Sequence, residues 1–144
     1  MQSPDRPSPG PAVDHSSITW RGSLSDEELE RLHAEAFDHP QGSTPWAARL
    51  ERWSLGWVTA RDGDALVGFI NVTWDGGEHA VLFDTCVARE ARGRGIGLAL
   101  VEAAAEGARA AGCSWLHVDF EDHLAPFYLD GAGFRPTAAG VFPL

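Results

Sequence analysis

The sequence predicts one domain of the α/β class, of the α+β kind, in which an antiparallel sheet leads into a β-α-β unit. Three observations support this prediction. Short apolar runs between 57 and 87 are separated by Asp-Gly signals, a pattern typical of antiparallel hairpins. A helical segment rich in Ala, Gly and Leu follows over 95–111. The next apolar run, 114–120, is expected to pair in parallel with the strand before that helix, because the helix separates the two.

Length and composition agree with a single folded domain. The chain has 144 residues, of which 44% are hydrophobic and 22% are charged, as is usual for a protein that buries a core. We expect a disordered, proline-rich leader over 1–15, because its small polar residues cannot bury surface. One domain is expected over 16–144. No apolar run approaches the roughly 20 residues that a bilayer span needs.

The charge of the chain is strongly acidic, at −10, and all 11 basic residues are arginine. This balance argues against nucleic acid or an anionic membrane as a partner. It fits either a cationic, amine-bearing partner or a general contribution to solubility. The absence of lysine excludes a P-loop lysine and a Schiff-base lysine. Cys86 and Cys113 match neither a disulfide framework nor a metal site, and the N-terminus is unlike a secretory signal, so we expect a cytoplasmic protein with free thiols.

The first half of the chain carries clear helix signals. Ser25 and Glu28 have the spacing of a capping box, which predicts a helix that runs to about Asp38. Pro45 is a favourable first-turn residue and predicts a second, short helix that ends near Trp53. Apolar runs bounded by turn residues predict strands at 17–20, 57–61, 65–74 and 79–87.

The second half is expected to complete the β-α-β unit and to return to the sheet. The helix over 95–111 is closed by Gly112, and its small residues let it lie close to the sheet. The strand over 114–120 reads as buried. A short helix over 124–130 and a final strand over 134–141 complete the predicted fold.

A glycine-rich turn over 92–97 connects the strand at 79–87 to this helix. A strand, then glycines, then a helix N-terminus is an arrangement that binds anions, because free backbone N–H groups and the helix dipole point at the ligand. Arg92 and Arg94 add charge-assisted donors. The alternative is a turn that only permits tight packing of helix on sheet. The turn lacks the Gly-Lys pair of a Walker A loop, and its glycine spacing does not fit a dinucleotide fingerprint.

Two motifs together resemble those of the GNAT superfamily of N-acetyltransferases, and the resemblance covers roughly residues 17–144. The motif residues are Arg92, Gly95 and Gly97 in the first motif, and Ala125, Tyr128, Gly133 and Phe134 in the second. The resemblance implies a mixed, mostly antiparallel sheet of about six to seven strands flanked by about four helices, with a central β-α-β cofactor unit. It also implies that the fourth and fifth strands splay apart to form a cleft for acetyl-CoA.

By this resemblance, the pyrophosphate of acetyl-CoA binds the turn, and the pantetheine arm pairs like an extra strand with the backbone of the fourth strand. The implied turn residues are Arg92, Gly93, Arg94, Gly95, Ile96, Gly97 and Leu98. The implied strand residues are Cys86, Val87 and Ala88. The Val87 N–H would hydrogen-bond the thioester carbonyl and stabilise the oxyanion that develops on attack.

The resemblance places a general acid at Tyr128, the one tyrosine of the chain, where a phenol protonates the departing thiolate. A tyrosine that only packs the core is the alternative. The family's base positions match Val81 and Phe83, which are apolar, so the base does not carry over. Glu78, His79 and Asp84 are tentative candidates for it, and Asp84 could instead bind the amine or be a capped strand-end carboxylate.

Two weaker features remain. Asp122 stands where the family often has an asparagine that contacts the pantetheine arm, and an ionised aspartate accepts hydrogen bonds but does not donate them. Alternating acids and histidines between His117 and His123 resemble a metal cluster, but strand alternation often produces such a pattern, so we expect no metal.

We therefore expect an acetyl-CoA-dependent N-acetyltransferase, in which an amine of a small molecule or peptide attacks the thioester directly. The alternative is a non-catalytic acyl-CoA-binding or regulatory module of the same fold. We expect no nucleic-acid or membrane partner, and either a monomer or a homodimer.

Overall fold

The computed structural model describes residues 17–144, and the leader predicted over 1–15 lies outside them. The strands are β1 (Ile18–Trp20), β2 (Ser54–Asp62), β3 (Ala65–Trp74), β4 (His79–Val87) and β5 (Trp115–Val118). The α-helices are α1 (Asp26–Phe37), α2 (Trp46–Trp53) and α3 (Ile96–Ala110). The short helical turns are η2 (Arg89–Ala91), η3 (Asp122–Leu124) and η4 (Pro126–Gly131), of which η4 is π-helical.

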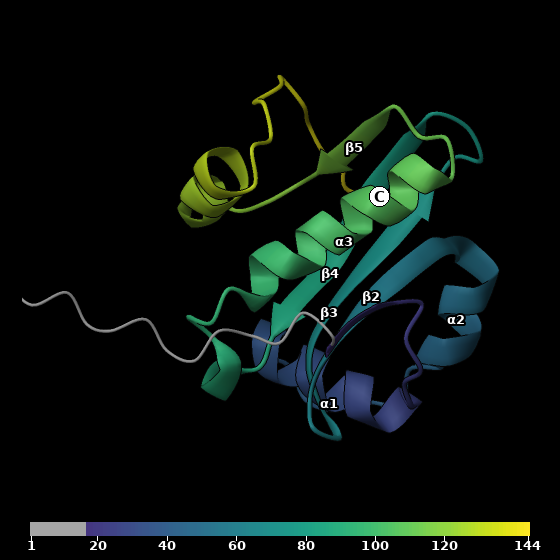
Figure 1. The fold of residues 1–144 in the computed structure, drawn as a ribbon, viewed down its shortest axis with the longest axis vertical. Helices are drawn as coiled ribbons and strands as arrows, with labels where there is room; N and C mark the ends of the chain where they lie inside the picture. Colours follow the sequence, from purple (N-terminus) through teal and green to yellow (C-terminus); the bar gives the residue numbers. More distant parts are fainter. Residues whose placement is uncertain (1–16) are drawn as a thin grey trace, which may run out of the picture.

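The strands form one sheet in the order β1-β2-β3-β4-β5 (Figure 1). The first three pairs are antiparallel, and β4 pairs with β5 in parallel through the crossover helix α3. The predicted fold class and the β-α-β unit are therefore confirmed. The described part of the sheet has five strands, fewer than the six to seven expected.

The final strand predicted over 134–141 is wrong, because residues 134–144 form neither helix nor strand. The Phe134 amide donates to the Tyr128 carbonyl at 2.9 Å, so the segment starts against η4 instead of along β5. Pro136 has no N–H to give to a sheet ladder, which further disfavours a strand here. Residues 131–137 instead line a cavity of about 830 Å³ together with α3 and β5.

The strand and helix predicted on either side of residue 121 also need correction. β5 is parallel as expected but shorter than 114–120, and it is not buried, since Trp115 is 52% exposed. The reason is that β5 is the last strand of the described sheet, so only one of its edges is paired. The helix predicted over 124–130 is divided into η3 and η4.

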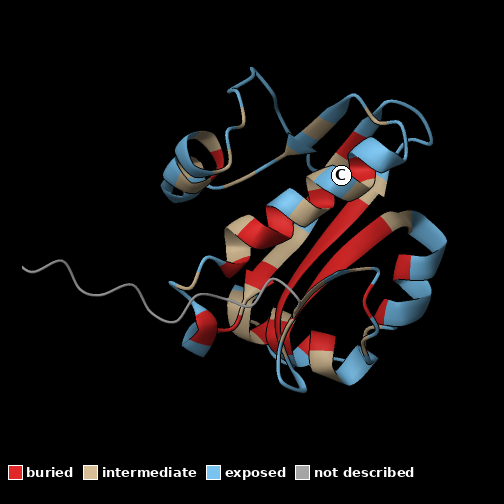
Figure 2. Ribbon diagram, in the orientation of Figure 1, coloured by how far each residue is buried: buried red, intermediate tan, exposed pale blue. Residues whose placement is uncertain are grey.

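The sheet is covered on both faces, α3 lying on one and α1 with α2 on the other. A Cβ added at Gly68 of β3 would stand 2.9 Å from Ile96, so this side of β3 faces α3. The next residue, Phe69, points the opposite way, and its ring lies 6.5 Å from that of Trp46 on α2. The central strands β2 and β3 are buried along most of their length between these layers (Figure 2). Small residues were also expected to bring α3 close to the sheet. Gly107 of α3 confirms this, because it packs against the ring of Trp20 on β1.

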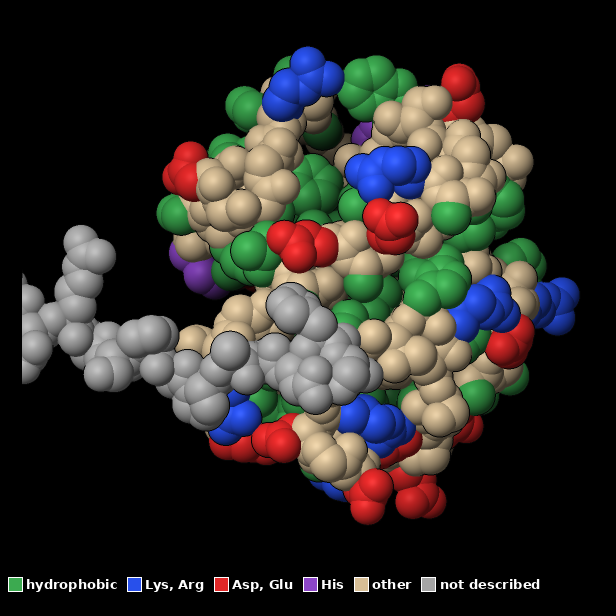
Figure 3. Space-filling view, in the orientation of Figure 1, with side chains coloured by type: hydrophobic (Ala, Val, Ile, Leu, Met, Phe, Trp, Pro, Cys, Tyr) green, Lys and Arg blue, Asp and Glu red, His purple; other side chains and the backbone are tan. Residues whose placement is uncertain are grey.

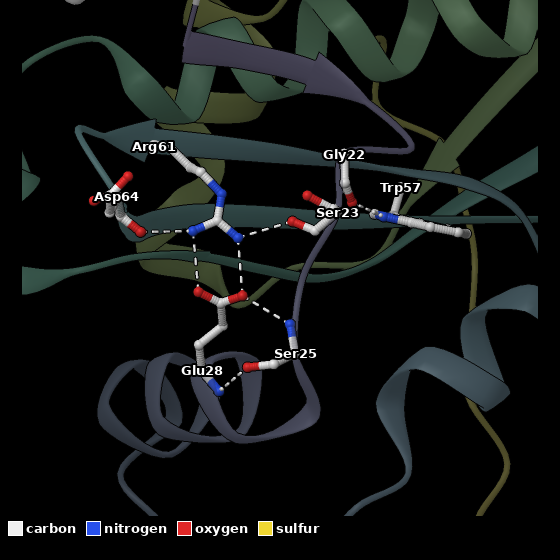
Figure 4. Close-up of polar contacts among 7 residues, drawn as sticks. All are labelled: Gly22, Ser23, Ser25, Glu28, Trp57, Arg61 and Asp64. Carbon is white, nitrogen blue, oxygen red and sulfur yellow. Dashed lines mark hydrogen bonds and ion pairs between the residues drawn. The ribbon is translucent and has the colours of Figure 1, made fainter.

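One cluster of polar contacts fixes the start of α1 to the β2–β3 hairpin (Figure 4). The predicted capping box is present, with Ser25 and Glu28 each accepting from the backbone N–H of the other. The Glu28 carboxylate also binds Arg61 of β2 through two parallel hydrogen bonds of 3.0 and 2.8 Å. The same guanidinium donates to the carbonyls of Asp64 and Ser23. A single arginine therefore joins the hairpin, the loop before α1 and its first turn.

We predict that Glu28→Gln lowers the free energy of unfolding at neutral pH by about 1–2 kcal/mol, because it removes a bidentate charged pair. The hydrogen bonds from Arg61 hold the pKa of Glu28 below its usual value. A lowered pKa means that this stabilisation is present above the ordinary glutamate pKa and is lost as the pH falls through the lowered one. Urea unfolding at neutral and acidic pH should show the difference between wild type and variant shrinking in acid. Glu27→Gln, at an exposed position one residue earlier, is the control, and an equal effect there would contradict the assignment.

Candidate functional site

The parallel pairing of β4 and β5 stops half-way along β4. The two strands are in register from His79 and Trp115 to Leu82 and Val118, and no further. Beyond Leu82, β4 continues for five residues that pair only with β3. The predicted splaying of the fourth and fifth strands is therefore present in the register, and it leaves one edge of β4 without a strand partner.

A β-bulge in β4 lies at the point where the strands separate. Asn71 of β3 pairs with Phe83, but Phe69 pairs with Cys86, so Asp84 and Thr85 together stand opposite one residue of β3. Asp84 has a φ of 57°, a left-handed conformation that aspartate adopts more readily than most residues. Bulges bend a strand and increase its local twist, which accounts for the separation of β4 from β5 at this position.

The backbone groups of Val87 point into the opening. Val87 stands opposite Gly68 of β3, and the following amide, that of Ala88, donates to the Val67 carbonyl at 2.8 Å. Because successive backbone groups of an antiparallel strand point toward and away from the partner in turn, the Val87 N–H and C=O point away from β3. Since β5 pairs only as far as Leu82, the Val87 N–H is a hydrogen-bond donor at an open strand edge.

The glycine turn brings the N-terminus of α3 to the same end of β4. Gly93 and Gly95 have φ values of 78° and 80°, which a side chain would strain, and nothing lies within 4 Å of where a Cβ would stand on either. Gly95 is the N-cap of α3 and supplies no side-chain acceptor. The first amides of a helix have no partner within it, so those of Ile96, Gly97 and Leu98 are available to an anion.

The arginines of this region do not form a single cluster. Arg92 donates from Nε to the Val87 carbonyl at 3.3 Å, so its guanidinium lies at the open edge. Arg94 instead forms an ion pair of 3.1 Å with Asp62 of the β2–β3 hairpin. Arg89 donates to the Glu35 carbonyl of α1. Basic and acidic side chains are interspersed over the face that α3 covers (Figure 3). Arg92 is the residue of the three that is turned toward Val87.

The two sequence motifs touch each other. A Cβ added at Gly97 would stand 3.3 Å from the ring of Phe127, so the first turn of α3 packs directly on η4. Tyr128 follows, and its ring stacks on Phe120 at 4.9 Å and meets Phe127 and Phe134 edge-on. Tyr128 is only 5% exposed. The contact between the motifs places the tyrosine beside the opening between β4 and β5.

The Tyr128 hydroxyl makes no hydrogen bond to another residue within 17–144, although the residue as a whole is buried. A phenol hydroxyl can both donate and accept a hydrogen bond.

Asp84 contacts one histidine, His33, which contacts a second, His39, and the sequence analysis singled out neither. His33 of α1 lies 3.0 Å from the Asp84 carboxylate through Nε2, and its Nδ1 lies 2.7 Å from Nε2 of His39. Both histidines precede Asp84 by more than 40 residues and match no motif, so only the tertiary structure brings them to it. The bulge and the packing of α1 on β4 together place this polar group on the face opposite α3.

The remaining predicted residues lie elsewhere. Glu78 precedes β4, where its carbonyl accepts from Ser114 and Trp115, and at about 3.3 Å per residue it is about 30 Å from Val87. The structure therefore does not bring Glu78 to the other candidates, and His79, which pairs with Trp115 at the start of β4, lies at that same far end. Asp122 is exposed on η3, between β5 and η4. Within residues 17–144, no three His, Cys, Asp or Glu side chains are placed to hold a metal ion.

The Cys86 thiol is buried on the α1 face of β4, beside the bulge. Burial, together with the negative charges of Asp84 and Glu35, raises the pKa of Cys86 far above that of a free thiol. A thiol reacts as its thiolate, so burial and the raised pKa make Cys86 a poor nucleophile in the folded protein.

The comparisons with known proteins agree with this geometry. Residues 22–134 match the family model described as the acetyltransferase (GNAT) family, and the chain therefore belongs to that family. No curated protein sequence matches the chain. Among the described residues, no helix has the length and apolar character that a membrane crossing requires.

Several solved structures share the fold. A GNAT-family acetyltransferase from Streptococcus pneumoniae is 21% identical, with a TM-score of 0.71 over 88% of this chain and 96% of that one. Glucosamine-6-phosphate N-acetyltransferase from Arabidopsis thaliana is 14% identical, with a TM-score of 0.70 over 88% and 97%. An aminoglycoside N-acetyltransferase in complex with CoA is 18% identical, with a TM-score of 0.69 over 88% and 92%.

We predict that Gly95→Ala lowers the free energy of unfolding by about 1–2 kcal/mol, because alanine is strained in the left-handed conformation of this N-cap. Gly95→Asn should cost less, since asparagine tolerates that conformation and the space around Gly95 is open. Urea unfolding of both variants measures the difference. Equal losses for Ala and Asn would show that the backbone conformation of Gly95 is not what limits the substitution.

Proposed function

We propose that this protein transfers an acetyl group from acetyl-CoA to the primary amine of a small molecule or peptide. The observation that carries the proposal is the Val87 N–H at the open edge of β4, next to the free amides of α3. Acetyl-CoA supplies the thioester that is consumed. The fit rests on the open space in front of Gly93 and Gly95, where the backbone is approachable by a pyrophosphate.

The residues at the end of β4 would bind and orient the acyl donor. The amides of 92–98 hold the pyrophosphate, with Arg92 adding a charged donor beside Val87. The backbone of Cys86, Val87 and Ala88 pairs with the pantetheine arm in place of a neighbouring strand. Asp122, on the segment after β5, accepts a hydrogen bond from that arm.

Two groups would act on the reacting atoms. The Val87 N–H donates to the thioester carbonyl oxygen, and this hydrogen bond strengthens as negative charge develops on the oxygen. The Tyr128 hydroxyl gives its proton to the departing sulfur. The packing of the Tyr128 ring supports this role, because the stacked ring of Phe120 and the edge-on rings of Phe127 and Phe134 fix its position.

The proposal also covers the acceptor, the extent of the domain, the location and the assembly of the protein. The acceptor is cationic at neutral pH, as an amine is, and the acidic balance of the protein favours its approach. The domain spans 16–144 after a proline-rich leader. The proposed location is the cytoplasm, and the proposed assembly is a monomer or a homodimer.

The function is tested by thiol release from acetyl-CoA in the presence of a panel of simple amines, polyamines, aminoglycosides and peptide N-termini. Release that depends on one class of amine supports the proposal and names the acceptor. CoA binding without release for any amine would favour the non-catalytic module. Failure to bind CoA would overturn both.

We predict that Tyr128→Phe lowers kcat by about 100-fold, since it removes one general acid and keeps the packed ring. CoA affinity, measured by calorimetry, should be unchanged, because the hydroxyl makes no contact on which the amides of α3 depend. The thermal midpoint is the control for packing and should also be unchanged. A variant that turns over as fast as the wild type would contradict the assignment of Tyr128 as the acid.

A further inference from the structure

A continuous chain of hydrogen bonds runs from the bulge of β4 to the surface. The Asp84 carboxylate lies 3.0 Å from His33 Nε2, and His33 Nδ1 lies 2.7 Å from His39 Nε2. His39 Nδ1 lies 2.7 Å from the carbonyl oxygen of Pro40. Asp84 and His33 are mostly buried, whereas His39 is only partly buried. This series of hydrogen bonds therefore has an inner end at Asp84 and an outer end at His39.

The donors and acceptors of Asp84, His33 and His39 fix how many protons the three residues share when all their hydrogen bonds form. A carbonyl oxygen only accepts, so His39 must carry its proton on Nδ1 and present Nε2 as an acceptor. His33 then donates from Nδ1 to His39, and a third proton is needed between His33 Nε2 and Asp84. Two neutral histidines and a carboxylate carry two protons in total. All three hydrogen bonds form only when the group holds one proton more, so it is built to take up and release a single proton.

The surroundings of the group favour transfer along this line. The His33 ring contacts the rings of Phe37 and Trp46 at centroid distances of 4.5 and 5.0 Å, and its side chain is only 16% exposed. Other titratable groups lie nearby. Glu30 of α1 interacts electrostatically with His39. Glu35 of α1 and Asp84 both act on the thiol of Cys86.

The inner end lies near the proposed reaction centre. Asp84 precedes Val87 by three residues of β4, about 10 Å at the rise of a strand. It lies on the face of α1, whereas Gly68, the residue opposite Val87, faces α3. An acceptor amine that comes from the α1 side would therefore reach the open edge past Asp84, while the anion site at the start of α3 stays on the other face.

We propose that Asp84, His33 and His39 form a proton relay that deprotonates the acceptor amine, an inference that rests on the proposed function. The N–H bond of the ammonium group breaks, and its electron pair stays on nitrogen for attack on the thioester carbon. The proton passes through water to Asp84 and forms the hydrogen bond between Asp84 and His33 Nε2. His33 gives its Nδ1 proton to Nε2 of His39, and His39 releases its own Nδ1 proton to water in place of the Pro40 carbonyl, so one proton enters and one leaves. Asp84 therefore receives the proton of the substrate only through water. His33 and His39 do not contact the substrate and act on the reaction through Asp84.

The variant Asp84→Asn tests the proton relay, because asparagine has nearly the same size and shape as aspartate. The asparagine NH₂ group donates to His33 Nε2, so all three hydrogen bonds form without the additional proton. The variant should fold with the group locked in its neutral form. His39→Gln is a second test, because it keeps an acceptor for His33 but cannot carry a proton outward. His79→Gln is the matched control, since His79 makes a similar 2.8 Å contact with His117 at the far end of β4.

The first readout is NMR of ¹⁵N-labelled histidine between about pH 5 and 9, with no substrate. In the wild type, His39 should keep its proton on Nδ1 at the alkaline end, and His33 should gain one proton as the pH falls. In Asp84→Asn, that gain should move to lower pH. A neutral His39 with its proton on Nε2, or a His33 titration that Asp84→Asn does not move, would overturn the relay.

The second readout is the pH profile of kcat with the fastest amine of the panel. Asp84→Asn should lower kcat at neutral pH by about 100-fold, and its kcat should rise steadily with pH where the wild type reaches a plateau. His39→Gln should lower kcat less, and His79→Gln should behave as the wild type. A parallel fall at every pH would indicate a structural role and overturn the relay. If the wild type releases no thiol with any amine, the proposed function fails and the relay has no substrate to serve.

Discussion

The bulge at Asp84 and Thr85 is the constraint on which the rest of the site depends. One additional residue in β4 bends the strand away from β5 after Leu82, and this gives the sheet an unpaired edge in its interior. The same bulge sets the alternation that follows it, so that the Val87 N–H points outward from β3 and the Asp84 side chain points to α1. Without the bulge, the pairing of β4 with the chain of β5 could continue past Leu82. The Val87 N–H would then be hydrogen-bonded within the sheet.

The elements around this edge are held by close contacts that only small residues allow. Gly68 lets the start of α3 lie directly on β3, and Gly97 lets Phe127 of η4 approach the first turn of α3. The second contact joins motifs that are about 30 residues apart in the chain. A larger side chain at Gly97 would push η4 outward and carry Tyr128 with it. The glycines of this turn thus have two roles. Gly93 and Gly95 allow the backbone conformation of the turn, whereas Gly97 allows the contact that positions Tyr128.

Features that depend on neighbours in the chain were predictable from the sequence, and features that depend on tertiary contacts were not. The capping box of Ser25 and Glu28, the helix α3 and the parallel direction of β5 follow from local pattern and connectivity, and all were confirmed. The bulge leaves no signature in an apolar strand. His33 and His39 lie far from Asp84 in sequence. A final strand over 134–141 was expected to complete the fold, but a strand needs a partner edge, and the Phe134 amide bonds to η4 instead.

The burial of Cys86 has a consequence for the protein's own chemistry. A chain that handles an activated acyl group is a possible target for that group, and thiolates and free amines are the side chains that react with it most readily. Cys86 is adjacent to Val87, but its raised pKa keeps it as a thiol. The chain has no lysine, so it has no side-chain primary amine, and guanidinium groups stay protonated. On the proposed activity, the protein is a poor substrate for itself, and the acetyl group is left for an external amine.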